Sequence, residues 1–471
     1  MNKKCQVFTP ADYVDKLLDN VGYIENLYGK RILENSCGDG NVLAVVVQRY
    51  INDCRKRGFS RTKIKNGLAK DIYGVEIDPE QHKKCINRLN EILEINNIKP
   101  LQWNILNGDY LKREDNVRYE FIVGNPPYIT YKEMEEADQL YLREHFESCE
   151  KGKFDYCYAF IEKSIKSLSR NGRMAYLIPS SIFKTVFGAK LRMMMQSYIE
   201  KIFDFTQEKM FNEALVKSAI MVLNANRADN ILYYTDVTLQ KDLELSIELL
   251  GDKWFFAENI GCGSRRFGDY FKVSHVVATL LNEAYVLKEG DYTEMDDCYK
   301  CNNHYIEKGV VRNTATPRSL RYNKTEKIIF PYYYENNQIV RYSEEEFEER
   351  FPGAFDYLND YREQLDERES DGNSKWFEYG RSQALSGLNV DKLLISTVIT
   401  TEVAVYRLNL DCIPYAGMYI VAKDENNEIT LDGAMEILQD RNFMQYVLDV
   451  GIHISGSSLR ITSKDIEDYR F

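Results

Sequence analysis

The stretch "KRILENSCGDGNVLAVVVQRY", residues 30–50, contains the pattern that decides the fold. It begins as a short apolar strand, and a turn with two glycines follows at once. The glycines permit a tight turn and a close approach of the backbone to a ligand. The apolar residues after the turn recur at helical spacing, and this helix is expected to end near Gly58. The stretch therefore predicts a strand–loop–helix unit with free N–H groups at the start of the helix.

The alternation of strand-like and helix-like patterns continues outward from this stretch to about residue 230. Further strands are expected over 71–78, 101–109, 119–125, 173–179, 199–205 and 217–223, and further helices over 79–95 and 154–172. This pattern predicts an α/β fold, a mostly parallel sheet with helices on both faces. After it, short irregular strands, aromatic residues and clustered arginines predict a mixed α+β second domain. We expect the domains to span 1–240 and 241–471.

The bulk composition excludes several classes of protein. Apolar residues make up 44% of the chain and charged residues 28%, as in a normal globular protein. A length of 471 residues predicts two or three domains. It has no apolar run of ~18 residues, which a membrane span needs, and the stretch "MNKKCQVFTP" lacks the apolar core that is typical of a signal peptide. Ten scattered cysteines suit a reducing cytoplasm. The net charge of −12 does not exclude nucleic acid, because binding depends on a local patch.

Chemistry-bearing side chains follow four successive expected strands. The first strand ends in Glu34 and a loop with Ser36, and the next three are followed by Glu76, by Asp109 and by the turn that contains Asn125. Each feature alone is often a helix cap or a simple turn. Together they favour a ligand site, because ligands bind outside the carboxyl ends of such strands.

A nucleoside would explain the two acids. One carboxylate can bind both hydroxyls of a ribose, and the second can accept a hydrogen bond from the amine of adenine. Three apolar or aromatic side chains could enclose the base: Ile77, Tyr110 and Phe160.

The turn Asn125-Pro126-Pro127-Tyr128 has a restricted backbone. Each proline fixes its own φ and pushes the preceding residue into an extended conformation. Such a turn can aim an amide oxygen, a backbone carbonyl and an aromatic ring at one point.

In motif order, the first ~225 residues resemble the S-adenosylmethionine-dependent DNA adenine-N6 methyltransferases of the gamma type, the TaqI-like and Eco57I-like group. The segments that carry the resemblance are "VFTP", "LENSCGDGN", "GVEIDP", "NGDYL", "GNPPY", "FDYCYAFIEKS", "GRMAYLIPSS" and "KMFNEALVKSAIMVL". The resemblance implies a Rossmann-like class I methyltransferase sheet and the activity EC 2.1.1.72. One departure is Asn35, where the family often has proline after the acid.

The resemblance also implies roles for individual residues. The catalytic set is Asn125, Pro126, Tyr128 and Phe211, the last from "KMFNEALVKSAIMVL". The cofactor-binding set for S-adenosylmethionine is Thr9, Pro10, Glu34, Ser36, Gly38, Gly40, Glu76, Ile77, Asp109, Tyr110, Asn125 and Phe160. Either Glu34 or a loop carbonyl would bind the methionine ammonium.

In this family the second domain would be a target-recognition domain on double-stranded DNA. Arginine suits bidentate contact with guanine, and the candidate residues are Arg265, Arg266, Arg312, Arg318, Arg321 and Arg381. The pair Cys298 and Cys301 lacks a second pair at zinc spacing, so no metal is expected.

Other functions remain as alternatives to DNA adenine-N6 methylation. An Asn-Pro-Pro-Tyr turn also serves methylation of protein glutamine, of guanine N2 in RNA and of cytosine N4 in DNA. A non-catalytic specificity subunit and a nicotinamide dehydrogenase are further alternatives. The expected setting is a bacterial restriction-modification system, with a monomeric enzyme in the cytoplasm at the nucleoid. Any cleavage is expected to belong to a separately encoded endonuclease.

Overall fold

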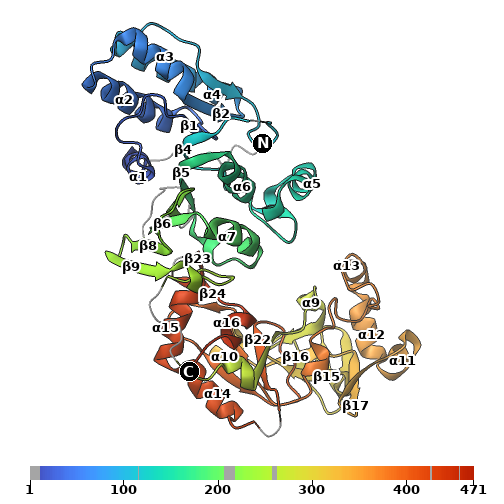
Figure 1. The fold of residues 1–471 in the computed structure, drawn as a ribbon. Helices are drawn as coiled ribbons and strands as arrows, with labels where there is room; N and C mark the ends of the chain where they lie inside the picture. The colour runs from blue at the N-terminus through green and yellow to red at the C-terminus, as the bar shows by residue number, and fades with distance from the viewer. Residues whose placement is uncertain (1–10, 115, 206–217, 257–262, 425–426, 456) are drawn as a thin grey trace. The chain divides into compact units, whose positions relative to one another are not determined.

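The computed structural model describes residues 11–114, 116–205, 218–256, 263–424, 427–455 and 457–471. The chain divides into two compact units, Met1–Glu258 and Asn259–Phe471 (Figure 1). This division lies later than the expected boundary at 240 and 241. The cause is a hairpin of β8 (Ile231–Asp236) and β9 (Lys241–Ser246), which extends the sheet of the first unit. The functions assigned to the two parts remain predictions.

The first unit is built on a mostly parallel sheet, as the sequence predicts. The described strands follow the order β3-β2-β1-β4-β5-β7-β6-β8-β9. Strands β1 to β5 are mutually parallel, whereas β7 runs antiparallel to both of its neighbours. The bounds are β1 Ile32–Glu34, β2 Ile72–Glu76, β3 Asn104–Asn107, β4 Tyr119–Gly124, β5 Leu168–Pro179, β6 Ile199–Asp204 and β7 Ser218–Asn224.

Helices cover both faces of this sheet, and Figure 1 shows α1 and α6 on opposite sides of β4 and β5. Successive strand residues point to opposite faces, so Phe121 and Val123 pack in one apolar cluster and Ile122 packs in the other. The Phe121 cluster contains side chains of α1 (Ala11–Val21), α2 (Asn41–Lys56), α3 (Arg61–Asp71) and α4 (Pro79–Ile95). The Ile122 cluster contains side chains of α5 (Glu136–His145), α6 (Cys157–Ser167) and α7 (Ala189–Gln196).

The end of α6 differs from the sequence-based expectation. The helix ends at Ser167 rather than near Gly172, because Leu168 is already extended and begins β5. The pairing of β5 with β4 is irregular, with a register shift between Tyr119 and Phe121. At this shift Gly172 lies against the Tyr119 carbonyl, since a Cβ on residue 172 would come within 2.7 Å of that oxygen.

The second unit is rich in β-structure, as expected. Its main sheet has the order β10-β22-β19-β21, with β10 Phe271–His275, β22 Met418–Ala422, β19 Lys392–Ile395 and β21 Val405–Leu408. Smaller sheets join β11 Val286–Lys288, β16 Glu326–Ile329 and β15 Val311–Thr314; β12 Thr293–Glu294, β13 Cys298–Cys301 and β14 His304–Glu307; β17 Tyr332–Glu335 and β18 Gln338–Arg341; and β20 Val398–Ile399, β24 Ser458–Arg460 and β23 Ile452–Ser455.

Short helices connect these sheets. They are α8 Phe267–Tyr270, α9 Asn282–Tyr285, α10 Pro317–Arg321, α11 Glu344–Arg350, α12 Pro352–Asn359, α13 Arg362–Asp366, α14 Leu431–Gln439, α15 Arg441–Val450 and α16 Ser463–Glu467. Within the described part of the chain, no helix combines the length and the apolar character that crossing a membrane requires.

Candidate active site

The glycine loop after β1 is held against the end of β2. The Gly38 N–H donates to Oε2 of Glu76 over 2.8 Å, and the Asp78 N–H donates to Oε1 of the same carboxylate over 2.8 Å. At Gly40, φ is +83° and a Cβ would lie 2.7 Å from Sγ of Cys85. Only glycine fits there without strain. The loop therefore brings the Gly38 N–H to the expected ribose-binding acid.

The same loop contacts the proline turn that follows β4. The Ser36 hydroxyl donates to the backbone carbonyl of Asn125 over 3.1 Å. Because β1 and β4 are neighbouring parallel strands, their carboxyl ends meet at one edge of the sheet. The structure thus brings together Ser36 and Asn125, which lie far apart in the sequence.

Asn35, the departure from the family pattern, belongs to a buried polar network. Its Nδ2 donates to Oγ of Ser164 on α6 over 3.0 Å and also to the Tyr176 hydroxyl on β5. The Ser164 hydroxyl also contacts the hydroxyls of Tyr176, at 2.7 Å, and Tyr110, at 3.2 Å. The Asn35 Oδ1 lies beside Gly124, the residue before Asn125. The network therefore joins the glycine loop to the wall of the expected base site.

Asp109 and Tyr110 follow β3 in a turn that is fixed from two sides. Oδ1 of Asp109 accepts from the Leu111 N–H over 2.8 Å, and Lys163 on α6 donates to the Tyr110 carbonyl over 2.5 Å. The rings of Tyr110 and Phe160 lie 5.3 Å apart at an angle of 41°. This pair of buried aromatic rings could form one wall of a base site, whereas Ile77 is 41% exposed after β2.

Tyr128 lies beside Ser218, at the start of β7. Burial raises the pKa of the Tyr128 phenol, and a hydrogen bond with Ser218 opposes that shift. Ser218 in turn accepts from the Phe205 N–H through its carbonyl over 3.0 Å. The flanks of residues 206–217 therefore meet beside Tyr128. Phe211 itself lies outside the described residues, as do two expected cofactor-binding residues, Thr9 and Pro10.

Glu34 is suited to a cationic ligand group. Its side chain is 3% exposed, and none of the residues that the structure describes forms a hydrogen bond with its Oε2. Burial is the largest cause of its raised pKa, and Cys85 and Glu76 act in the same direction. An ammonium group would stabilise the charged carboxylate at this position. The residues at this edge therefore fit S-adenosylmethionine, with Glu34 available to its ammonium and Glu76 to its ribose.

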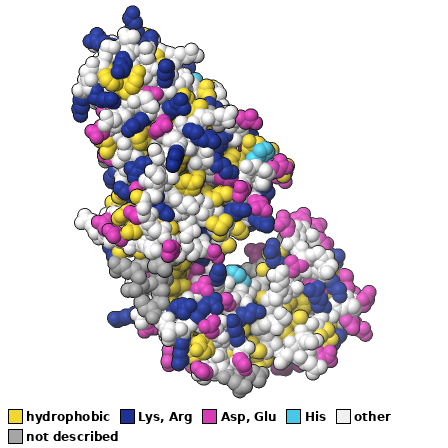
Figure 2. All heavy atoms as spheres, in the orientation of Figure 1, with side chains coloured by type: hydrophobic (Ala, Val, Ile, Leu, Met, Phe, Trp, Pro, Cys, Tyr) yellow, Lys and Arg dark blue, Asp and Glu magenta, His cyan; other side chains and the backbone are white. Residues whose placement is uncertain are grey.

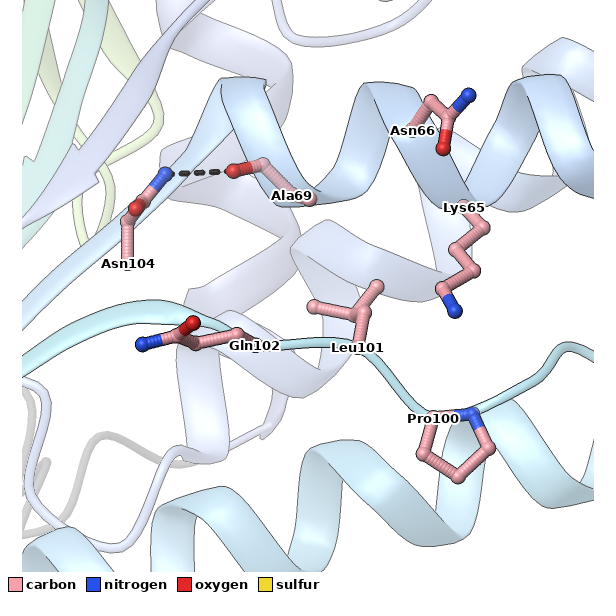
Figure 3. Close-up of a pocket in the computed structure, with 7 residues that line it drawn as sticks. All are labelled: Lys65, Asn66, Ala69, Pro100, Leu101, Gln102 and Asn104. Carbon is pink, nitrogen blue, oxygen red and sulfur yellow. Dashed lines mark hydrogen bonds between the residues drawn. The ribbon is translucent and has the colours of Figure 1, made fainter.

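The described residues also form a hollow of about 650 Å³ elsewhere in the first unit. Figure 3 shows it between α3, with Lys65 and Asn66, and the segment that leads into β3, with Pro100 and Leu101. Asn104, which donates to the Ala69 carbonyl over 2.7 Å, closes one end (Figure 3). This hollow lies at the amino end of β3, so it is separate from the candidate active site at the carboxyl ends.

Sequence reasoning missed several residues that position the site. Lys163 and Ser164 contact the expected site residue Tyr110, and Tyr176 contacts Ser164. A lysine or a serine on the apolar face of an amphipathic helix is the signal that could have found the first two. Nothing in the local pattern distinguishes Tyr176 from an ordinary core residue.

The six arginines expected to bind DNA differ in their surroundings. Arg266 contacts Asp468 at 2.7 Å and Asp269 at 3.4 Å, so two carboxylates already surround it. Arg318 and Arg321 lie on α10 and are exposed, and Arg321 is 3.7 Å from Glu402. Exposed side chains also include Arg265 and Arg381, and Arg312 is half-buried. Figure 2 shows both signs of charge on the visible face of the molecule.

Cys298 and Cys301 lie on β13, and Cys301 is paired in register with His304 on β14. His304 Nε2 lies 2.8 Å from Oδ2 of Asp360. Among the residues that the structure describes, no group of three or more histidine, cysteine or acidic side chains is arranged to hold a metal ion.

Comparison with known proteins supports the sequence-based resemblance. Residues 41–211 match the family model of the Eco57I restriction-modification methylases. The chain is 26% identical over 420 residues to the type II restriction enzyme and methyltransferase RM.Eco57I of Escherichia coli, covering 73% of this chain and 41% of the relative. It is 28% identical over 254 residues to the type II methyltransferase M.BstVI of Geobacillus stearothermophilus, covering 50% of this chain and 45% of the relative. The chain thus spans less than half of either relative.

Solved structures share the fold over nearly the whole chain. The type IIL restriction-modification enzyme MmeI, solved in complex with DNA, has a TM-score of 0.63 at 15% identity, covering 97% of this chain and 63% of that one. A nuclease-deletion mutant of the type ISP enzyme LlaGI has a TM-score of 0.57 at 12% identity, covering 98% of this chain and 46% of that one. The expected class I methyltransferase fold, with an additional β-rich region, is confirmed.

Proposed function

We propose that this protein is a site-specific DNA methyltransferase of a restriction-modification system, and that it methylates the N6 amine of adenine in double-stranded DNA (EC 2.1.1.72). The hydrogen bond from Ser36 to the Asn125 carbonyl supports this proposal most directly. It fixes the proline turn beside the glycine loop, so that a base bound at the turn would meet the methyl donor.

Each functional residue of the proline turn makes a different contact with the target adenine. When bound, S-adenosylmethionine supplies an electrophilic methyl group. The Asn125 Oδ1 and the Pro126 carbonyl accept hydrogen bonds from the adenine amine, which orient it and favour a more localised lone pair. Tyr128 stacks on one face of the base, and the segment that follows Phe205 supplies Phe211 to the other face.

The remaining site residues hold reactants in place. Glu34 and Glu76 bind the ammonium and the ribose of the donor, and Tyr110 with Phe160 encloses its base. Ser36 and the Asn35 network hold the Tyr110–Phe160 pair and the catalytic turn in fixed positions. Positioning of this kind supplies much of the rate enhancement in a direct transfer. Because the adenine amine lies inside the duplex, the base must first leave the stack.

The second unit would read the DNA sequence through its exposed arginines, and a separately encoded endonuclease would be the partner in restriction. The proposal includes a monomeric enzyme in the bacterial cytoplasm.

Long-read sequencing that detects modified bases tests this function. DNA from cells that express the protein should carry N6-methyladenine in one sequence motif. DNA from cells that express Asn125→Ala should lack it, since the amide oxygen that orients the amine is gone. Methyl label transferred to RNA, to protein or to cytosine instead of adenine would contradict the proposal.

A further inference from the structure

Two exposed apolar side chains lie on the loop that joins β5 to α7, next to the candidate active site. Val186 is 59% exposed and Phe187 is 45% exposed. They form the short 3-10 helix Val186–Gly188, which follows a second one at Ser180–Phe183. Because β5 runs parallel to β4 and is its neighbour, this loop leaves the same edge of the sheet as the turn at Asn125. Large apolar side chains at such an edge are candidates for contact with a partner.

The loop is linked to the catalytic turn by a short chain of hydrogen bonds. The Thr185 hydroxyl contacts the Tyr158 hydroxyl at the start of α6 over 2.9 Å. Two residues earlier, the Tyr156 N–H donates to the carbonyl of Ile129 over 2.9 Å. Ile129 directly follows Tyr128. The exposed tip and the expected base-stacking ring are therefore supported by the same first turn of α6.

Buried side chains fix the base of the loop between β5 and α7. Arg192 on α7 is 1% exposed and donates to the carbonyls of Ile182, over 2.7 Å, and Asp252, over 2.6 Å. Burial lowers the pKa of this guanidinium to about 10. The ring of Phe183 stacks on Trp254 at 6.0 Å. A buried charge is costly unless it is hydrogen-bonded, and here the two carbonyls bind the guanidinium and thereby hold the loop whose tip stays exposed.

The surface around the tip is suited to a polyanion. The Phe187 ring covers Gly152, since a Cβ on residue 152 would lie 2.0 Å from its Cδ1. Lys151 is 88% exposed in its side chain, and Lys153 is also exposed. The acids nearby are Glu147 and Glu150, which face Lys190 at 3.8 Å and 3.7 Å. Glu150 also lies 3.7 Å from Lys151, so phosphate binding would exchange this exposed ion pair for a contact with DNA. Two lysines therefore flank an apolar tip.

We propose that Val186 and Phe187 form the wedge that packs against the DNA duplex beside the extruded adenine, with Lys151 and Lys153 on the adjacent phosphates. This inference rests on the proposed function. An extruded base leaves unstacked neighbours and an unpaired partner base, and apolar side chains compensate for that loss. The rigid loop holds its apolar tip ready for this contact.

Single-turnover methylation rates on two duplexes test whether Val186 and Phe187 act as this wedge. One substrate is a duplex with the motif mapped by sequencing, and the second is the same duplex with an abasic site opposite the target adenine. The variant Val186→Ser/Phe187→Ser should methylate the paired duplex more slowly by roughly tenfold or more, because extrusion is harder. It should approach the wild-type rate on the abasic duplex, where extrusion costs less. When 2-aminopurine replaces the target adenine in the paired duplex, its fluorescence should increase less on binding of the variant than on binding of the wild type.

The matched control is Ile95→Ser, at an apolar side chain that is 78% exposed at the end of α4, at the opposite edge of the sheet. It should behave as the wild type on both duplexes, and all three proteins should bind sinefungin equally. An equal loss on both duplexes, no loss at all, or a changed oligomeric state with unchanged rates would overturn the wedge. If the wild type methylates neither duplex, the proposed function fails instead.

Discussion

At the scale of single residues, the site depends on polar groups whose partners lie far away in the sequence. Ser36 holds the carbonyl of Asn125, and Asn35 joins Ser164 and Tyr176 in the core. A proline at position 35 would stiffen the loop through its own ring. Here an asparagine reaches a comparable restriction through hydrogen bonds to α6 and β5. Hydrogen bonds rather than a ring thus restrict this loop.

Asp155, just before α6, carries a pH dependence of stability. Burial raises the pKa of its carboxyl from 3.8 to about 6, and Glu133 adds to the shift. A raised pKa means that the folded state prefers the protonated acid. The free energy of unfolding should therefore fall as pH rises from about 4 to about 6, as the folded carboxyl ionises at a cost.

The variant Asp155→Asn should remove this dependence and unfold at a higher temperature than the wild type at pH 7.5. Thermal unfolding at a series of pH values measures both effects. Glu144→Gln, at an exposed carboxyl on α5, is the control and should leave the pH profile unchanged. A wild-type profile that is flat between pH 4 and pH 6 would count against the assignment.

At the scale of elements, the sequence predicts the strands of the first sheet well. Strands β2, β3, β4 and β6 fall inside the expected ranges, and β7 extends one residue beyond its range. Each is a short run with apolar residues that turn residues bound. Helices α3 and α5 were missed, since their polar sequences have weak periodicity and their helical state depends on packing. The order of the strands comes from long-range pairing, which no local pattern contains.

The same limit applies to the candidate site. Residues at the strand ends, such as Glu34, Glu76 and Asn125, could be predicted because parallel strands present their carboxyl ends together. Arg192 could not be predicted, because it acts on the backbone carbonyls of Ile182 and Asp252, which no local pattern places beside it.

Lys392 on β19 shows how one buried side chain can hold a sheet together. Its Nζ donates to the carbonyls of Asn409, over 2.8 Å, and Cys412, over 3.0 Å, in the connection from β21 to β22. Lys392→Met should destabilise the second unit by about 1–3 kcal/mol, because these carbonyls lose a buried donor. Chemical denaturation measures the loss. The control is Lys288→Met, at an exposed position on β11, which should have little effect.

The pH dependence provides a second check on Lys392. Burial lowers the pKa of its ammonium to about 8 from 10.5. Wild-type stability should therefore rise between about pH 8 and pH 10, since the folded ammonium loses its proton before the unfolded one. Lys392→Met should lack this rise. The same rise in the variant would assign it to another group.

At the scale of the whole molecule, the two units would divide catalysis from recognition. Arg318 and Arg321 are exposed on α10 of the second unit. The variant Arg318→Glu/Arg321→Glu should bind DNA more weakly and with a flatter dependence on salt, because fewer counterions are released. Fluorescence anisotropy at several salt concentrations measures both quantities.

A double variant in the first unit controls for net charge. Arg61 and Lys70 are exposed on α3. Arg61→Glu/Lys70→Glu changes the net charge equally and should leave the slope with salt near that of the wild type. If both double variants weaken binding alike, the loss reflects overall charge, and α10 is not a specific contact.

The hairpin that extends the first sheet has a further consequence, for solubility. Strand β9 is the last in the order of the described sheet, and its exposed side chains include Lys241, Asp242 and Glu244. An outermost strand attracts strands of other copies, and charged side chains discourage such pairing. These three charged side chains should therefore keep separate copies of the protein from joining through this edge.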